Sequence, residues 1–280
     1  MQKSKLFFLI LSVLCFNTTV FSQEGSKRII SLSPALTEEI YLLGIEDKLV
    51  GCTIYCKRPP SAQKKEKVGN VVEVNVEKII SLRPDLVLAT ELTDPKDIEK
   101  LKALGISVIN FPTPRNFSEI CEGFLRLARI VRREQKAKEI VEEANKEIET
   151  IKEMVKDLPK PKVFVQIGAR PLFTVTKDSF IHNLIELAGG INIASSAKTG
   201  LYSRENVIRK DPDVIIIASM GITGKKEKKH WEAYKTLKAV KGERIYFIDA
   251  SEVCSPTPLS FVEALKEIVE LIHPEIKKDG

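Results

Sequence analysis

The chain has little of what several specialised protein classes depend on. Only 14 Gly and 14 Pro occur among 280 residues, which excludes collagen-like and low-complexity chains. Aromatic residues make up 6% of the chain, with a single Trp. The 44 Lys and Arg are nearly balanced by 38 Asp and Glu and are spread along the chain, whereas nucleic-acid-binding proteins usually cluster them on one face. We therefore expect a globular protein of about two domains with no nucleic-acid partner.

The common enzyme signatures are also missing. The sequence has no G-x-S-x-G, no G-x-x-x-x-G-K-[ST] and no H-E-x-x-H, and no G-x-G-x-x-G follows a predicted strand. The three histidines, His182, His230 and His273, are far apart, so a histidine-based metal or acid–base site has little support. The sequence therefore predicts no enzyme, no catalytic residue and no resident metal or cofactor.

Long apolar runs are confined to the N-terminus. Lys3 and Lys5 precede an apolar run of about 11 residues, and small residues stand at Val20 and Ser22, a pattern typical of a secretory signal peptide. A membrane anchor is the alternative, but a spanning helix needs about 20 residues. We predict that residues 1–22 are cleaved and that the mature chain is periplasmic or extracytoplasmic. Lipid attachment at Cys15 is not expected, because Leu14 stands where Gly, Ala or Ser is favoured.

Four of the five cysteines would remain after cleavage. Cys121 lies on the apolar stripe of an amphipathic helical pattern, which predicts a buried thiol. Cys52, Cys56 and Cys254 leave two alternatives open. Two of them form a disulfide, or they bind a metal, although the C-x3-C spacing lacks the second pair of a typical zinc site.

The remaining pattern alternates short apolar runs with helical periodicity, which predicts parallel sheets covered by helices. Strands are expected at 28–32, 85–90, 107–111, 162–168, 213–218 and 244–249, and helices at 34–43, 94–104, 178–188 and 259–272. The basic run at 225–229 is expected to be a solvated turn. The alternation of strands and helices occurs twice along the chain, so we predict an N-terminal α/β lobe over 23–132 and a C-terminal α/β lobe over 159–280.

One long helix is predicted between the lobes, over residues 133–158. Apolar residues recur there at helical spacing, and Pro159 and Pro161 end the pattern. About 25 helical residues span roughly 37 Å, so the connection should act as a rigid strut and not as a flexible hinge.

An internal repeat relates the two halves. Residues 75–89 and 203–218 each place a Glu seven positions before a Pro-Asp, which an apolar strand follows at once. The two residues are Glu77 and Glu205. Either Glu alone would suit the solvated first turn of a helix. Their matched positions instead indicate a carboxylate on an equivalent corner of each lobe, where a two-fold symmetric partner could bind.

Several segments together resemble a known family. These are RIISLSPALTEEIYLLG, VNVEKIISLRPDLVLA, FIHNLIELAGGINIA, YSRENVIRKDPDVIII, TLKAVKGERIYFID and the long helix. The chain resembles the periplasmic substrate-binding proteins that serve ATP-driven (ABC) importers of cobalamin, ferric siderophores and haem. The resemblance implies two Rossmann-like lobes joined by a single rigid helix, with a ligand cleft between them. It also implies docking to a permease dimer through Glu77 and Glu205.

The ligand is expected to be a metal chelate, held by loops that follow the strands. Ligand-binding residues are predicted to be Tyr55, Arg58, Thr90, Glu91, Arg170, Phe173, Tyr202 and Glu252. Cobalamin-binding relatives carry tryptophans where this chain has Val71, Thr90 and Thr199, while Arg58 and Arg170 would suit an anionic chelate. The choice among corrinoid, haem and ferric siderophore stays open. A direct metal-ion carrier and an extracytoplasmic enzyme are the alternative functions.

Overall fold

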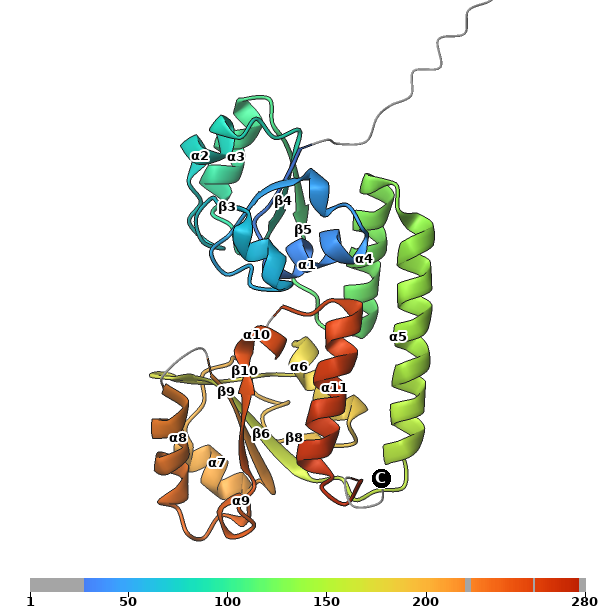
Figure 1. Ribbon diagram of the computed structural model, residues 1–280. Helices are drawn as coiled ribbons and strands as arrows, with labels where there is room; N and C mark the ends of the chain where they lie inside the picture. The colour runs from blue at the N-terminus through green and yellow to red at the C-terminus, as the bar shows by residue number, and fades with distance from the viewer. Residues whose placement is uncertain (1–27, 220–222, 254, 277–280) are drawn as a thin grey trace, which may run out of the picture.

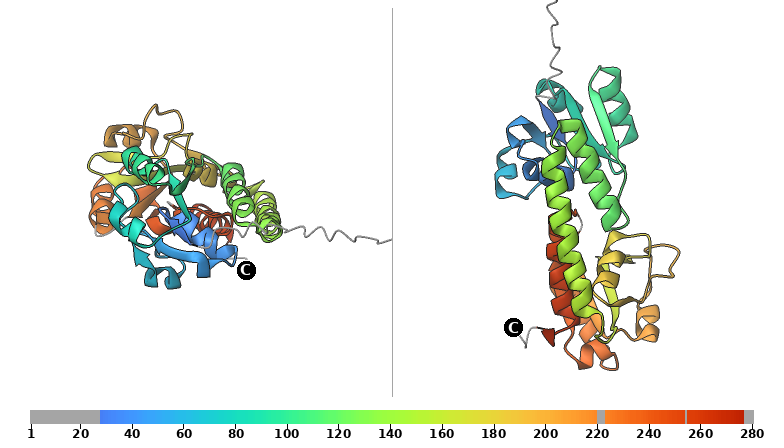
Figure 2. Two further views of the ribbon diagram at one scale, coloured as in Figure 1. Left: turned by 90° about the horizontal axis from the view of Figure 1, so that it is seen from above. Right: turned by 90° about the vertical axis from the view of Figure 1, so that its right-hand side faces the viewer.

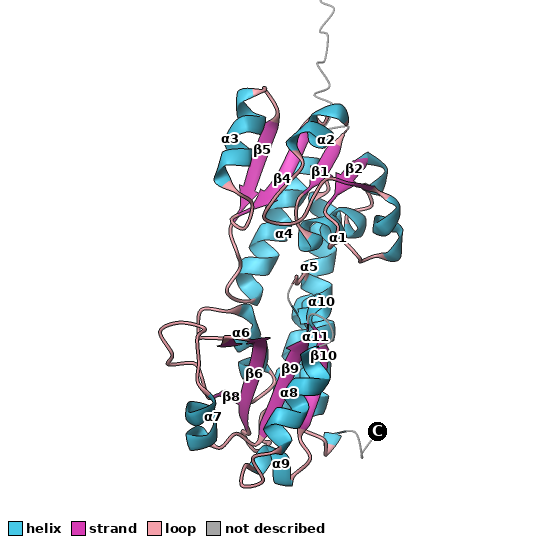
Figure 3. Cartoon of the chain, turned by 90° about the vertical axis from the view of Figure 1, so that its left-hand side faces the viewer, coloured by secondary structure: helices cyan, strands magenta, loops and turns pink. Residues whose placement is uncertain are grey.

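A computed structural model describes residues 28–219, 223–253 and 255–276 (Figure 1). The predicted signal peptide, residues 1–22, lies outside this part of the chain. The described residues form two α/β lobes, and each lobe is built on its own sheet (Figure 3). No helix in the described part is both long and apolar enough to cross a membrane.

The N-terminal lobe contains a five-stranded sheet whose strands all run parallel. The strand order is β3-β2-β1-β4-β5. The elements are β1 (Ile29–Ser31), α1 (Pro34–Leu42), β2 (Leu49–Cys52), β3 (Glu66–Lys67), α2 (Val76–Ser81), β4 (Leu86–Thr90), α3 (Pro95–Ala103) and β5 (Ser107–Phe111), with short 3-10 turns at Glu46–Lys48 and Pro60–Lys64. The central strands are apolar and buried on both faces, as in a helix-covered parallel sheet.

The C-terminal lobe is built on a second five-stranded sheet, which differs from the first in its strand pairing. Its sheet has the order β10-β9-β6-β7, and β8 also pairs with β6. The elements are β6 (Lys162–Ala169), β7 (Leu172–Thr174), α6 (Phe180–Leu187), β8 (Ile191–Asn192), α7 (Arg204–Lys210), β9 (Val214–Ser219), α8 (Thr223–Glu232), α9 (Lys238–Lys241), β10 (Ile245–Asp249), α10 (Ala250–Val253) and α11 (Pro258–Ile272). Strand β7 is antiparallel to β6, because only Arg170 and Pro171 connect the two strands and so short a link permits a hairpin only.

The expected turn at 225–229 is wrong, because these residues belong to helix α8. The helix has a narrow buried side formed by Glu227 and Trp231, which stand four positions apart. The lysines around them face solvent or lie half-buried. Two buried residues in a strongly basic run give too weak a periodic signal for a helix to be predicted from sequence.

Two long helices lie beside both lobes. Helix α4 is Phe117–Val131, and α5, at the place predicted for the connecting helix, is Glu134–Val155. In the right-hand view of Figure 2, α5 runs along the N-terminal lobe and then along α11 of the C-terminal lobe. Ala137 and Ile140, near its start, belong to the N-terminal core. Further along the same helix, Ile148 and Ile151 belong to the C-terminal core. Both cores therefore depend on one continuous helix.

The structure explains the Pro-Asp of the internal repeat. Asp85 accepts a hydrogen bond of 2.9 Å from the backbone N–H of Arg28, just before β1. Asp213 accepts one of 2.8 Å from the backbone N–H of Lys162, at the start of β6. In return, the backbone N–H of Asp85 donates to the carbonyl of Arg28, and the backbone N–H of Asp213 donates to the carbonyl of Lys162. The repeated Asp thus aligns the beginnings of two neighbouring strands in each lobe.

We expect Asp213→Ala to destabilise the protein by about 1–2 kcal/mol. A hydrogen bond to a charged group contributes about 1.5–3 kcal/mol, and the half-buried position of Asp213 reduces this contribution. Urea denaturation measures the change in the free energy of unfolding. Asp157→Ala, at an exposed position, is the matched control and should change stability by less than about 0.5 kcal/mol. Equal losses in the two variants would contradict the proposed role of the repeat.

Candidate functional site

A large cavity lies between the lobes at the carboxyl ends of the sheet strands. Its volume is about 1580 Å³. In open α/β sheets this edge is the usual place for a ligand, because loops and helix N-termini meet there. Residues directly following β1, β4 and β5 line the N-terminal side, and residues at the end of β10 line the other. The lining includes Ser33, Pro34, Glu38, Glu39, Tyr55, Arg58, Thr90, Glu91, Phe111, Arg115, Glu119, Glu122, Gly123, Arg126, Phe180, Asp249 and Ser255.

Four of the eight predicted ligand-binding residues line this cavity. Tyr55 and Arg58 come from the loop after β2, and Thr90 and Glu91 from the end of β4. Tyr55 is 52% exposed, so its ring is available to a ligand. Glu91 is held in place because its carboxylate accepts a hydrogen bond of 2.9 Å from the backbone N–H of Thr113. Their part in binding remains a prediction, and the structure brings all four together.

The other predicted residues do not line the large cavity. Arg170 lines a smaller cavity of about 470 Å³ with Arg204 and His230. Phe173 is 38% exposed on β7 and pairs in a β-bridge with Leu201. Tyr202 packs partly buried against the C-terminal core, and this burial raises the pKa of its hydroxyl. The side chain of Glu252 lies outside the described part of the chain.

Arg58 joins the two lobes. Its guanidinium forms an ion pair of 3.0 Å with Glu38 of α1 and donates a hydrogen bond of 3.4 Å to the carbonyl of Ser255. The hydroxyl of Thr257, at the start of α11, donates a bond of 3.4 Å to the same Glu38. Burial raises the pKa of Glu38, and the charge of Arg58 opposes that rise. Arg58 is therefore part of the cleft wall and already has a carboxylate partner.

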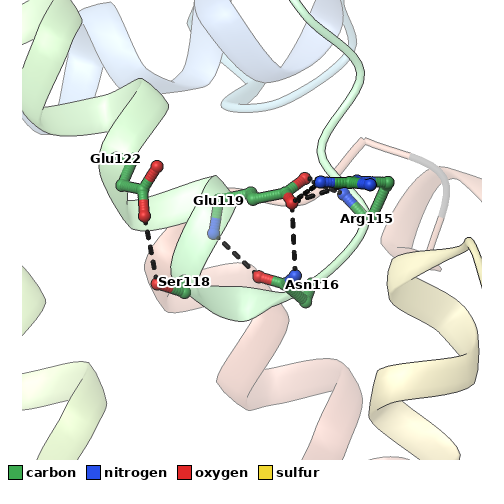
Figure 4. A network of polar contacts seen from close by, with 5 residues as sticks. All are labelled: Arg115, Asn116, Ser118, Glu119 and Glu122. Carbon is green, nitrogen blue, oxygen red and sulfur yellow. Dashed lines mark hydrogen bonds and ion pairs between the residues drawn. The ribbon is translucent and has the colours of Figure 1, made fainter.

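A second ion pair stands at the start of α4. Arg115 donates four hydrogen bonds to the Glu119 carboxylate, and the shortest, at 2.6 Å, joins Nη2 to Oε1 (Figure 4). Asn116 caps the helix by accepting a bond of 2.9 Å from the Glu119 backbone N–H, and Ser118 donates to Glu122. Hydrogen bonds from Arg115 hold the pKa of Glu119 below its usual value. In the sequence, Asn116 and Glu119 have the Asn-x-x-Glu spacing of a helix start. That spacing predicts a helix cap and does not predict a cavity wall.

Glu39 lines the cavity and was not among the residues predicted from the sequence. It lies on α1 and is only 4% exposed. Burial, followed by the neighbouring charge of Glu38, raises its pKa well above the ordinary value for a glutamate. Its position on the buried face of α1 would normally hold an apolar residue, and no motif marks it.

Cys52 and Cys56 are buried free thiols beside the cavity loop, and Cys121 is a buried free thiol as predicted. The Cys56 sulfur accepts a hydrogen bond of 3.1 Å from the hydroxyl of Thr37 and lies 3.2 Å from the hydroxyl of Thr53. The neighbouring Cys52 thiol and the two hydroxyls lower the pKa of Cys56, while Lys67 donates to the Cys52 sulfur at 3.2 Å. Cys254 lies outside the described residues. Within 28–219, 223–253 and 255–276 no group of three or more His, Cys, Asp or Glu is arranged to hold a metal.

Glu77 and Glu205 occupy equivalent positions. Each is the second residue of a short helix, α2 or α7, that precedes a central strand of its sheet. Asn75 and Ser203 cap these helices through their side chains. Both glutamates are exposed. In Figure 1, α2 and α7 lie in different lobes, on the side of the molecule away from α5.

The fold and sequence are similar to those of known transport proteins. A family model described as Periplasmic binding protein matches residues 29–252. An uncharacterised ABC transporter substrate-binding lipoprotein of Bacillus subtilis (strain 168), YvrC, is 32% identical over 272 residues, which cover 94% of this chain and 85% of YvrC. The vitamin B12-binding protein of Yersinia pestis (strain Pestoides F) is 31% identical over 210 residues, covering 74% of this chain and 75% of that protein.

A solved structure has the same architecture. The crystal structure of a possible iron-binding (periplasmic solute-binding) protein from Staphylococcus epidermidis ATCC 12228 superposes with a TM-score of 0.79 at 29% sequence identity. The match covers 89% of this chain and 99% of that protein. The similarity therefore includes both lobes.

Proposed function

This chain belongs to the periplasmic binding protein family and serves as an extracytoplasmic substrate-binding protein for an ABC importer, and we propose that its substrate is a metal chelate. The observation that carries the proposal is the cavity of about 1580 Å³ between the lobes. Pockets for drug-sized molecules usually measure about 300–1,000 Å³, so this cavity suits a larger ligand such as a corrinoid, a haem or a ferric siderophore. The named relatives support this class. We propose binding and release with no chemical change to the ligand.

The importer partner is proposed to bind both lobes at once. Glu77 and Glu205 are exposed at matched corners, and a permease made of two like subunits would offer one basic site to each. Ion pairs of this kind determine orientation and encounter rate more than affinity. The matched helix positions and the exposure of both carboxylates support this mode of docking.

Ligand binding should move the lobes only slightly. Helix α5 contributes side chains to both cores, so a wide hinge motion would have to disrupt packing in one of them. Small-angle scattering of the free and ligand-saturated protein should give radii of gyration within about 1 Å of each other. A contraction of several ångströms would contradict the shared-helix argument.

The exported protein is proposed to begin near Gln23. Intact-mass measurement of the protein isolated from its own cells should give the mass of residues 23–280 without a lipid. A mass that includes residues 1–22 would support an anchor, and a lipid on Cys15 would support a lipoprotein like the Bacillus relative.

Equilibrium titration tests the proposed substrate class. The mature protein would be titrated with a corrinoid, a haem and ferric siderophores, and separately with free ferric, zinc and cobalt ions and with the metal-free chelators. We expect at least one chelate to bind with a Kd of about 1 μM or below. Binding of a free ion with no binding of any chelate would instead support a direct metal-ion carrier.

A further inference from the structure

The smaller cavity of the C-terminal lobe is lined by basic side chains. Its volume is about 470 Å³, and it shares no lining residue with the large cavity. The link between β6 and β7, the start of α7 and the end of α8 supply its walls. These residues are Ala169, Arg170, Arg204, Lys229, His230, Ala233 and Tyr234. Among the residues that the structure describes, no Asp or Glu belongs to this lining, so the cavity offers positive charge to whatever enters it.

Two of the cations, Arg170 and Lys229, are accessible. Both residues are exposed, and neither forms an ion pair within the described part of the chain. They come from separate elements, the β6–β7 link and helix α8, and line one cavity. An arginine can bind a carboxylate through two parallel hydrogen bonds, and a lysine adds a compact charge. An anion that enters the cavity therefore finds two uncompensated charges.

A third cation, Arg204, is held in a fixed position beside them. Its Nη2 donates a hydrogen bond of 2.7 Å to Oε2 of Glu227, and its guanidinium lies 4.8 Å from the centre of the Trp231 ring. Glu227 is only 3% exposed, and the side-chain amide of Gln166 donates to the same oxygen at 2.9 Å. This buried carboxylate compensates Arg204. The charge that stays uncompensated at the cavity is that of the two exposed cations.

The basic cavity adjoins one of the two proposed docking corners. Arg204 lines the cavity, and the next residue of α7 is the exposed Glu205. The matched position in the N-terminal lobe is Val76, which precedes Glu77 in α2. The two corners therefore share a glutamate, but only the C-terminal glutamate follows an arginine. A protein surface that reaches Glu205 also reaches the edge of the basic cavity.

We propose that the basic cavity binds an acidic side chain of the permease subunit that docks on the C-terminal lobe, with Arg170 and Lys229 as its partners. The proposal rests on the proposed function and extends its docking mode, because the C-terminal corner then offers both a carboxylate and a receptor for a carboxylate. Neighbouring ion pairs of opposite polarity determine orientation strictly, since a displaced partner brings like charges together. The negative charge of Glu205 beside the cavity favours a protein surface of mixed charge over an anionic lipid surface.

Docking affinity tests the proposal without any chelate. The ligand-free mature protein would be titrated against its importer in phosphatidylcholine nanodiscs. We expect Arg170→Glu with Lys229→Glu to raise the docking Kd by about tenfold or more, because like charges would then meet. Replacing both residues by Gln should raise it less. Arg129→Glu with Lys138→Glu, at exposed positions of α4 and α5, alters the net charge equally and should change the docking Kd less than about threefold.

The outcomes separate this inference from the proposed function. Unchanged docking after reversal at Arg170 and Lys229, or an equal loss in the control pair, would overturn the role of the cavity. A loss seen only in nanodiscs that contain phosphatidylglycerol would assign the cavity to a lipid headgroup and overturn the permease partner. Reversal of Glu77 and Glu205 in the same assay tests the docking mode itself, and docking that persists there would overturn that mode and this inference with it. Melting temperatures confirm that each variant is folded.

Discussion

Charge reversal at both Glu77 and Glu205 should abolish ligand uptake while the protein still folds and binds its ligand. Both carboxylates are exposed and neither belongs to the residues that line the cavity, so no ligand contact should be lost. Lysine at these positions would repel the proposed basic sites of the permease. Docking should therefore be weakened more by charge reversal than by removal of the charge. We expect normal ligand affinity, uptake below about a tenth of the unaltered rate, and weaker docking at low salt.

Single variants separate docking from a structural role. Either single Glu→Lys change should lower uptake partially, and the two Glu→Gln changes together should lower it less than double reversal does. If the glutamates act only at helix starts, the variants will show a small fall in melting temperature and normal uptake. The caps at Asn75 and Ser203 remain in every variant, so helices α2 and α7 should still form.

Filling the cavity from α4 should weaken ligand binding strongly without harming the fold. Gly123 lines the cavity, and the space next to its Cα is empty. Gly123→Phe would place a ring where the ligand is proposed to sit, and we expect the Kd to rise by roughly hundredfold or more because a clash acts directly on the complex. Isothermal titration with the ligand found for the unaltered protein gives the comparison.

Gly123→Ala is the matched control for this variant. An Ala in the interior of α4 lowers the entropy of the unfolded chain, so the free energy of unfolding should increase by about 0.5–1 kcal/mol. Its single methyl group leaves most of the cavity open, and the Kd should change less than threefold or so. Full affinity in Gly123→Phe would show that the ligand binds elsewhere.

Much of the fold follows from local sequence signals. Buried apolar strands and Gly-terminated helices alternate clearly, and the run of apolar residues in α5 ends at two prolines. Even the pairing of lobes is visible, because Asp85 and Asp213 repeat with their glutamates. The strand, helix and proline signals each depend on residues within about 25 positions of one another, whereas the repeat compares two segments 128 positions apart. Helix α8 was not predicted, because only Glu227 and Trp231 mark its buried side.

The candidate site was only partly predictable, since it is formed by distant segments. The strand-end rule placed Tyr55, Arg58, Thr90 and Glu91 at the cavity. The rule does not say how far a loop reaches or which way its side chains point, so it also selected Arg170 and Tyr202. Arg170 lies in the β6–β7 hairpin and lines the smaller cavity, and Tyr202 packs against the C-terminal core. Glu39 could not be selected, because no local motif distinguishes a cavity-lining glutamate from the other charged residues of α1.

The measurement that tests chelate binding most directly is native mass spectrometry of the protein purified from its own cells, combined with metal analysis of the same sample. We predict a complex that exceeds the mature protein by the mass of one organic metal chelate, with one metal per chain. The Gly123→Phe variant, purified in the same way, should carry none. A mature protein that binds a bare metal ion, or an identical adduct on the Gly123→Phe variant, would contradict chelate binding in the cleft.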